Sequence, residues 1–158
     1  MRRRDALFPA TARFAAVGYG CASGTALIAV CRSLGLTRLT LLSPYVEPVS
    51  ERLRQTLAPA GIETPAFGGF EVAEEAHVVR IDGPSILQAA EAVAAQENVG
   101  GVFLSCTNLR TLDVIPPLQE KLGLPVLSIN LVLAWHLMHL AGLAAAGETP
   151  VQLLAKRV

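Results

Sequence analysis

Short apolar runs alternate with longer helix-patterned segments along this chain of 158 residues, and this alternation restricts the fold more than any other feature. The spacing predicts strands over 13–20, 38–43, 100–105 and 124–129. It predicts helices over 23–35, 46–60, 83–96, about 108–123 and about 130–146. Strands that alternate with helices of this length favour an α/β fold with a mainly parallel sheet.

Glycine and proline mark several of the expected boundaries. Gly35, Gly61 and Gly123 each follow a helical pattern and are expected to end it. The pair Pro116-Pro117 is expected to break or kink the helix that starts near Asn108. Residues 62–80 contain Pro65 and two adjacent glycines, and their pattern is compatible with either a short strand or a loop.

Composition limits the function classes. Apolar residues make up 52% of the chain and charged residues 16%, which predicts a packed core. The 13 basic and 13 acidic side chains balance, which argues against a nucleic-acid partner. No secretory pattern is visible, and three widely spaced cysteines are typical of a reducing compartment, so we expect a cytoplasmic protein. The apolar stretch 131–147 holds two histidines and favours a buried helix over a membrane span. A homo-oligomer is left open as a further expectation.

Two cysteines stand where an apolar run is expected to end and a helix to begin. Cys21 follows "VGYG" and precedes "ASGTA", and Cys106 follows "VFLS" and precedes "TNLRT". Ligands of parallel α/β proteins collect at the carboxyl ends of the strands. Cys31 instead shares an apolar helix face with Leu27 and Val30, which indicates packing.

A thiol in this position can be a reactive group. The positive end of a helix and its free N–H groups favour the thiolate. The same N–H groups, with the side chains of Ser23, Thr107 and Asn108, can hold a carboxylate. One thiol can then take a proton or attack carbon while the other delivers a proton. The alternative is that each cysteine is a small buried apolar residue.

Four segments carry a resemblance to a known family, and the similarity extends from about residue 13 to residue 142. They are "YGCASGTA" (19–26), "SPYVEPVSERL" (43–53), "VFLSCTNLRTLDVIPPLQEKLGLPVLSIN" (102–130) and "AWHLMHLAG" (134–142). Together they resemble the Asp/Glu racemase superfamily, in its maleate cis–trans isomerase and arylmalonate decarboxylase branch. The resemblance implies two Rossmann-like lobes related by a pseudo-twofold axis. Residues 1–36 plus 129–158 would form a first lobe with Cys21, and residues 37–128 a second lobe with Cys106.

The resemblance also implies roles for individual residues. Cys21 would add to the substrate and Cys106 would act as its acid/base partner. Tyr45 would hydrogen-bond a substrate carboxylate, within a cradle that includes Ser23, Thr107 and Asn108. The implied enzyme is an isomerase or racemase for a small carboxylate or dicarboxylate, without metal or organic cofactor, most like maleate isomerase.

Three alternatives stay open. One is an amino-acid racemase of the Asp/Glu type, and another is an arylmalonate-decarboxylase-like protein of ectoine catabolism. The third is a non-catalytic remnant, because similar proteins carry a further strand–helix unit before the segment that corresponds to Cys21, which would leave the first lobe incomplete. The Ala22-Ser23-Gly24 stretch also has one hydroxyl fewer than the Thr-Ser-Gly usual in the family.

Two other kinds of site are disfavoured. His136 and His139 are spaced as metal ligands on a helix, but no third ligand is near them in the sequence. Gly18, Gly20 and Gly24 do not have the spacing of a dinucleotide-binding loop.

Overall fold

The computed structural model describes residues 19–142 of the chain. Four parallel strands form one sheet in the order β2-β1-β3-β4, which confirms the predicted α/β fold. The strands are β1 (Arg38–Tyr45), β2 (Glu63–Val72), β3 (Gly101–Leu104) and β4 (Val126–Ser128). The helices are α2 (Tyr19–Leu34), α3 (Glu47–Leu57), α4 (Glu75–Val78), α5 (Gly83–Ala94), α6 (Ile115–Leu122) and α7 (Ile129–Leu140), with a 3-10 turn at Ala58–Ala60.

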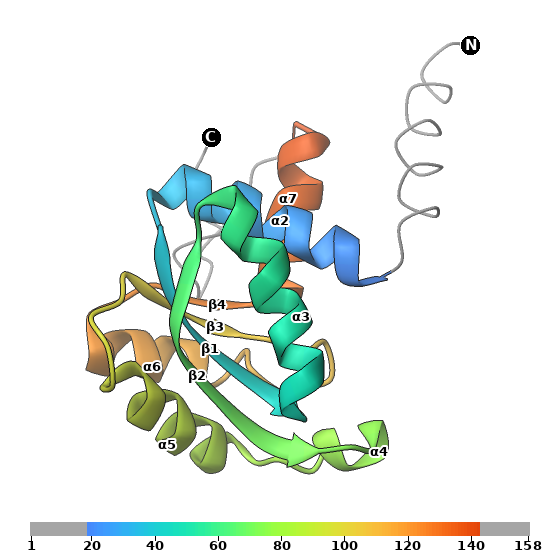
Figure 1. Cartoon of the computed structure of the whole chain (residues 1–158), viewed down its shortest axis with the longest axis vertical. Coiled ribbons are helices and arrows are strands. Elements are labelled where there is room, and N and C mark those ends of the chain that lie inside the picture. Colours follow the sequence, from blue (N-terminus) through green and yellow to red (C-terminus); the bar gives the residue numbers. More distant parts are fainter. Residues whose placement is uncertain (1–18, 143–158) are drawn as a thin grey trace.

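Helices cover both faces of the sheet (Figure 1). Helices α5 and α6 pack together on one face, and α3 lies on the other, where α2 packs against both α3 and α7. The central strands β1 and β3 are almost wholly buried, as expected for parallel strands covered on two sides. The hydrophobic core therefore includes both faces of the sheet and the inner sides of its helices.

Strand β2 is longer than residues 62–80 led us to expect. It lies at the edge of the sheet, where Pro65 removes no needed ladder hydrogen bond. Gly68 lets helix α5 approach closely, because a Cβ at this position would lie 2.4 Å from Val93 Cγ2. Opposite Ser43–Tyr45 the strand carries a bulge, and Glu71 within it has a positive φ of 52°.

Helix ends follow local chemistry that the sequence partly revealed. Gly61 and Gly123 have φ values of 79° and 65° and follow helical segments, as predicted. Asp82 caps α5 by accepting a hydrogen bond from the Ser85 backbone at 2.8 Å. Ser128 caps α7 in the same way through the Leu131 N–H.

The helix expected from Asn108 was wrong in its start. Residues 105–114 form turns, and α6 begins only at Ile115. The prolines lie in the first turn of α6, where the missing N–H groups cost nothing, so they start the helix and do not kink it.

The first expected strand, over 13–20, falls mostly outside the described residues. Its last two residues, Tyr19 and Gly20, belong to helix α2, so Cys21 lies inside the first turn of that helix. The sheet residues all lie within 37–128, while α2 and α7 come from the segments assigned to a first lobe. The division into two lobes stays a prediction.

Candidate active site

The site lies where β1 and β3 end side by side. Tyr45 is the last residue of β1, and Cys106 lies two residues beyond the end of β3. From β1 the chain continues into α3 on one face of the sheet, and from β3 it continues toward α6 on the other. Such a divergence opens a crevice at the carboxyl edge, which is the usual ligand position in open α/β sheets.

Cys106 is buried, with 1% of its surface exposed, and its sulfur has polar neighbours. Its Sγ lies 3.2 Å from the Tyr45 hydroxyl and accepts the Asn108 N–H at 3.2 Å. The Glu75 Oε1 is 4.0 Å away. These contacts distinguish Cys106 from Cys31, which lies in the core and whose pKa burial raises to about 11.

Tyr45 links the thiol to a carboxylate. Its hydroxyl donates to Glu75 Oε2 at 2.9 Å, and the Asn108 side-chain amide donates to Glu75 Oε1. The pKa of Tyr45 is raised far above its ordinary value, first by burial and then by its hydrogen bonds with Cys106 and Glu75. The phenol therefore keeps its proton at neutral pH and acts as a donor.

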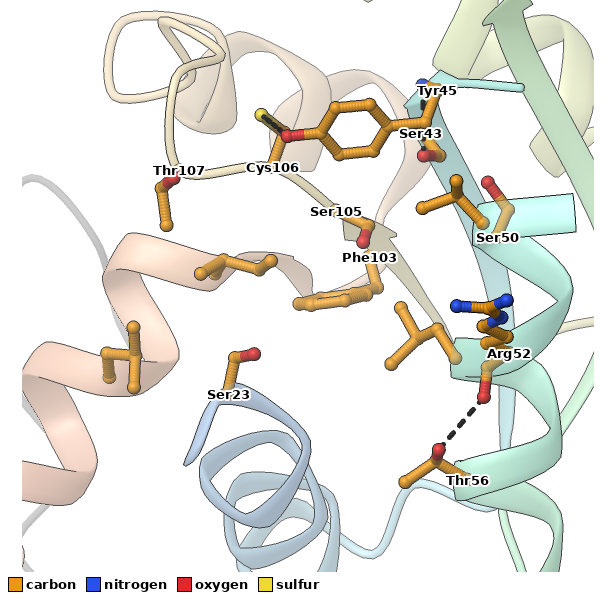
Figure 2. Close-up of a pocket in the computed structure, with 14 residues that line it drawn as sticks. Ser23, Ser43, Tyr45, Ser50, Arg52, Thr56, Phe103, Ser105, Cys106 and Thr107 are labelled. Carbon is orange, nitrogen blue, oxygen red and sulfur yellow. Dashed lines mark hydrogen bonds between the residues drawn. The ribbon is translucent and has the colours of Figure 1, made fainter. Parts of the chain in front are cut away.

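A pocket of about 610 Å³ opens beside the Tyr45–Cys106 pair (Figure 2). Among the described residues, its wall combines apolar side chains, hydroxyl groups and a cationic side chain, that of Arg52. The apolar residues are Val49, Leu53, Phe103, Ile129 and Leu133, and the hydroxyl-bearing ones are Ser23, Ser43, Tyr45, Ser50, Thr56, Ser105 and Thr107. The wall suits a small organic acid with an apolar part.

The structure brings most of the expected site residues together. Tyr45, Cys106, Thr107 and Ser23 line the pocket, with Ser23 reaching it from the start of α2 (Figure 2). Asn108 adjoins it and contacts Cys106 through its backbone N–H.

Cys21 precedes Ser23 by two residues in the same helical turn. Its side chain lies outside the described part of the structure, so its position relative to Cys106 stays a prediction.

The reason given for the reactivity of Cys106 needs correction. The sequence placed Cys106 at a helix N-terminus, but α6 starts nine residues later. The Cys106 sulfur instead accepts the Asn108 backbone N–H and lies in contact with the Tyr45 hydroxyl. A side-chain bond from Asn130 to the Thr107 carbonyl, at 2.9 Å, holds this turn against α7.

Two polar residues of the site were missed from the sequence. Glu75 begins a four-residue helix that had no recognisable pattern, and it reaches Tyr45 from 30 positions away. Ser50 lines the pocket with a buried hydroxyl that has no hydrogen-bond partner among the described residues. Neither residue has a sequence signal, because only the fold brings it to the carboxyl edge.

His136 and His139 lie on helix α7 and have ring and charge interactions with nearby side chains. His139 stacks on Trp135 with ring centroids 5.2 Å apart, and burial, followed by the charge of His139, lowers the pKa of His136. Within residues 19–142 no group of three or more His, Cys, Asp or Glu side chains is placed to hold a metal ion. In the same range no helix is long and apolar enough to cross a membrane.

Comparison with known proteins identifies the family. The model of the arylmalonate decarboxylase family matches residues 10–154. The arylmalonate decarboxylase of Bordetella bronchiseptica is 32% identical over 134 residues, covering 80% of this chain and 54% of that protein. A maleate isomerase of Geobacillus stearothermophilus is 28% identical over 106 residues, covering 67% of this chain and 42% of that protein.

A solved structure extends the comparison to three dimensions. The maleate cis–trans isomerase of Nocardia farcinica, as a cysteine-to-serine mutant with a covalently bound succinylcysteine intermediate, superposes with a TM-score of 0.79. The two sequences are 25% identical, and the match covers 86% of this chain and 56% of that one. The chain spans about half the length of the curated relatives it matches. It belongs to the arylmalonate decarboxylase family, in the branch of the Asp/Glu racemase superfamily that its sequence motifs resemble.

Proposed function

We propose that this protein is an isomerase or racemase that moves a proton at a carbon atom next to a carboxylate, with Cys106 as the acid/base group. The observation that carries the proposal is the Cys106 thiol, held 3.2 Å from the Tyr45 hydroxyl beside a pocket at the carboxyl edge of the sheet. Similarity to maleate isomerases, and to a structure of one with a succinylcysteine intermediate, supports chemistry by a cysteine.

Cys21 is proposed as the second thiol. In the isomerase form it adds to the carbon–carbon double bond, so that a C–S bond forms and the π bond becomes a carbanion. Cys106 then protonates that carbanion, rotation about the new single bond follows, and the reverse steps release the other isomer. The start of α2 reaches the pocket through Ser23, which supports a position for Cys21 near the substrate.

The amino-acid racemase form is the second candidate, and Glu75 favours it. A carboxylate beside the reacting thiol attracts an ammonium group at the reacting carbon, which aspartate and glutamate carry and maleate lacks. In this form one cysteine, as the thiolate, removes the α-proton, and the other, as the protonated thiol, delivers a proton to the opposite side. Neither form requires a metal or an organic cofactor.

The test is a substrate panel in D₂O, followed by proton NMR, with the full chain. Maleate reports isomerisation through fumarate, aspartate and glutamate report racemisation through loss of the α-proton signal, and phenylmalonate reports decarboxylation. We expect turnover in one of the first two arms, and its loss in both Cys21→Ser and Cys106→Ser. Turnover of phenylmalonate alone would replace the proposal with the decarboxylase alternative, and no turnover of any compound would contradict it.

A further inference from the structure

Glu75 occupies the hydrogen-bond donors that adjoin the Cys106 thiol. The Tyr45 hydroxyl donates to it at 2.9 Å, and the side-chain amide of Asn108 donates to its other oxygen. These are two of the groups that the family resemblance assigns to the substrate carboxylate. The Glu75 carboxylate therefore occupies the hydrogen-bond donors that a second carboxylate of a substrate would need.

The charge of Glu75 is not compensated within the described residues. No ion pair joins it to a lysine, arginine or histidine among residues 19–142. By contrast, Glu74 next to it lies 3.8 Å from His77. A negative group placed near Glu75 would be repelled, and a positive group would be attracted.

The opposite kind of charge lines the pocket. Arg52 is the cationic residue of the wall, and no hydrogen bond or ion pair of its guanidinium occurs among the described residues (Figure 2). One carboxylate can bind there, because a guanidinium matches a carboxylate with two parallel hydrogen bonds. The Arg52 guanidinium can therefore bind one substrate carboxylate. The Glu75 carboxylate, beside the Cys106 thiol, can accept a hydrogen bond from a positively charged substrate group.

We propose that Glu75 is a specificity-determining residue, which selects a carboxylate substrate bearing an ammonium group at the reacting carbon and disfavours a second carboxylate on that carbon. This inference rests on the proposed function and chooses between its two forms. In this arrangement the substrate ammonium donates hydrogen bonds to the Glu75 carboxylate, which keeps its hydrogen bonds with Tyr45 and Asn108. The apolar wall, which includes Phe103 and Leu133, accommodates the rest of the substrate.

A matched pair of ligands tests the proposal through binding alone. Phenylglycine and phenylmalonate share a ring and a carboxylate, and differ in an ammonium against a second carboxylate at the same carbon. Dissociation constants are measured by calorimetry for the full chain and for Glu75→Gln, Glu74→Gln and Arg52→Gln. Glu74→Gln is the matched control, since it makes the same charge change on the neighbouring residue.

We expect the parent chain to prefer phenylglycine, and Glu75→Gln to shift the ratio of the two constants toward phenylmalonate by at least about tenfold. Glu74→Gln leaves the ratio within about twofold, and Arg52→Gln weakens both ligands by similar factors. The proposal is overturned if the ratio is unchanged in Glu75→Gln, or if Glu74→Gln gives the same shift. It is also overturned if the parent chain prefers phenylmalonate or binds neither ligand. An Arg52→Gln effect confined to one ligand would overturn it as well. Because no turnover is read, an inactive chain that still shows the shift would contradict the proposed function and leave this inference intact.

Discussion

The hydroxyl of Tyr45 and the sulfur of Cys106 lie 3.2 Å apart, although 61 positions separate the two residues in the chain. The contact exists because β1 and β3 are neighbouring parallel strands that end at the same edge of the sheet. It gives the thiol a partner that keeps its own proton, since burial and hydrogen bonding raise the pKa of Tyr45. The chemistry of the site thus depends on strand pairing more than on the local sequence around either residue.

Tyr45→Phe removes this partner while keeping the ring. We expect kcat/KM for the substrate identified by the panel to fall about a hundredfold, because the acid/base thiol loses the hydroxyl that lies 3.2 Å from its sulfur. Steady-state kinetics measures the change, and the thermal midpoint shows whether the fold is intact. An unchanged kcat/KM in a folded variant would show that the Tyr45 hydroxyl takes no part in the reaction.

Tyr45 also makes stability depend on alkaline pH. Its pKa is raised in the folded state, so its contribution to stability is complete below the ordinary tyrosine value of about 10 and is lost as the pH rises toward the folded value. The parent chain should therefore lose thermal stability above pH ~10 more steeply than Tyr45→Phe. Parallel pH curves for the two proteins would contradict the raised pKa.

Ser50 and Thr40 provide a matched pair of buried hydroxyls that have no hydrogen-bond partner within residues 19–142. Ser50 lines the pocket, whereas Thr40 lies in the buried centre of β1. Ser50→Ala and Thr40→Val should each raise the free energy of unfolding by about 1 kcal/mol, because an unsatisfied hydroxyl is removed. Only Ser50→Ala should raise KM, by roughly fivefold, if the substrate satisfies this hydroxyl. Equal KM values in both variants would show that Ser50 does not contact the substrate.

Gly68 tests the packing of α5 on the edge strand. Gly68→Ala would place its Cβ 2.4 Å from Val93 Cγ2, and we expect a loss of about 2 kcal/mol in unfolding free energy. Urea denaturation of Gly68→Ala, Val93→Ala and the double variant measures the coupling between the two positions. The double variant should lose less unfolding free energy than the sum of the losses in the two single variants. Additive losses would show that the two side chains do not meet.

Much of the fold was predictable from sequence, because strand and helix periods and glycine stops are local signals. Glu75 and Ser50 of the site were not. Glu75 reaches Cys106 only through the length of β2 and its bulge near Glu71, and neither feature has a sequence pattern. The start of α6 was misplaced because the turn after Cys106 is held by tertiary contacts, including the Asn130 side chain.

The central claim is that Cys106 transfers the proton. The most direct measurement is the rate of the active panel reaction for Cys106→Ser beside Cys31→Ala, which removes the buried thiol of the core. The account predicts that Cys106→Ser loses at least about a thousandfold in kcat with its fold intact, whereas Cys31→Ala stays within about tenfold of the parent. A Cys106→Ser variant that turns over substrate at the parent rate would contradict it.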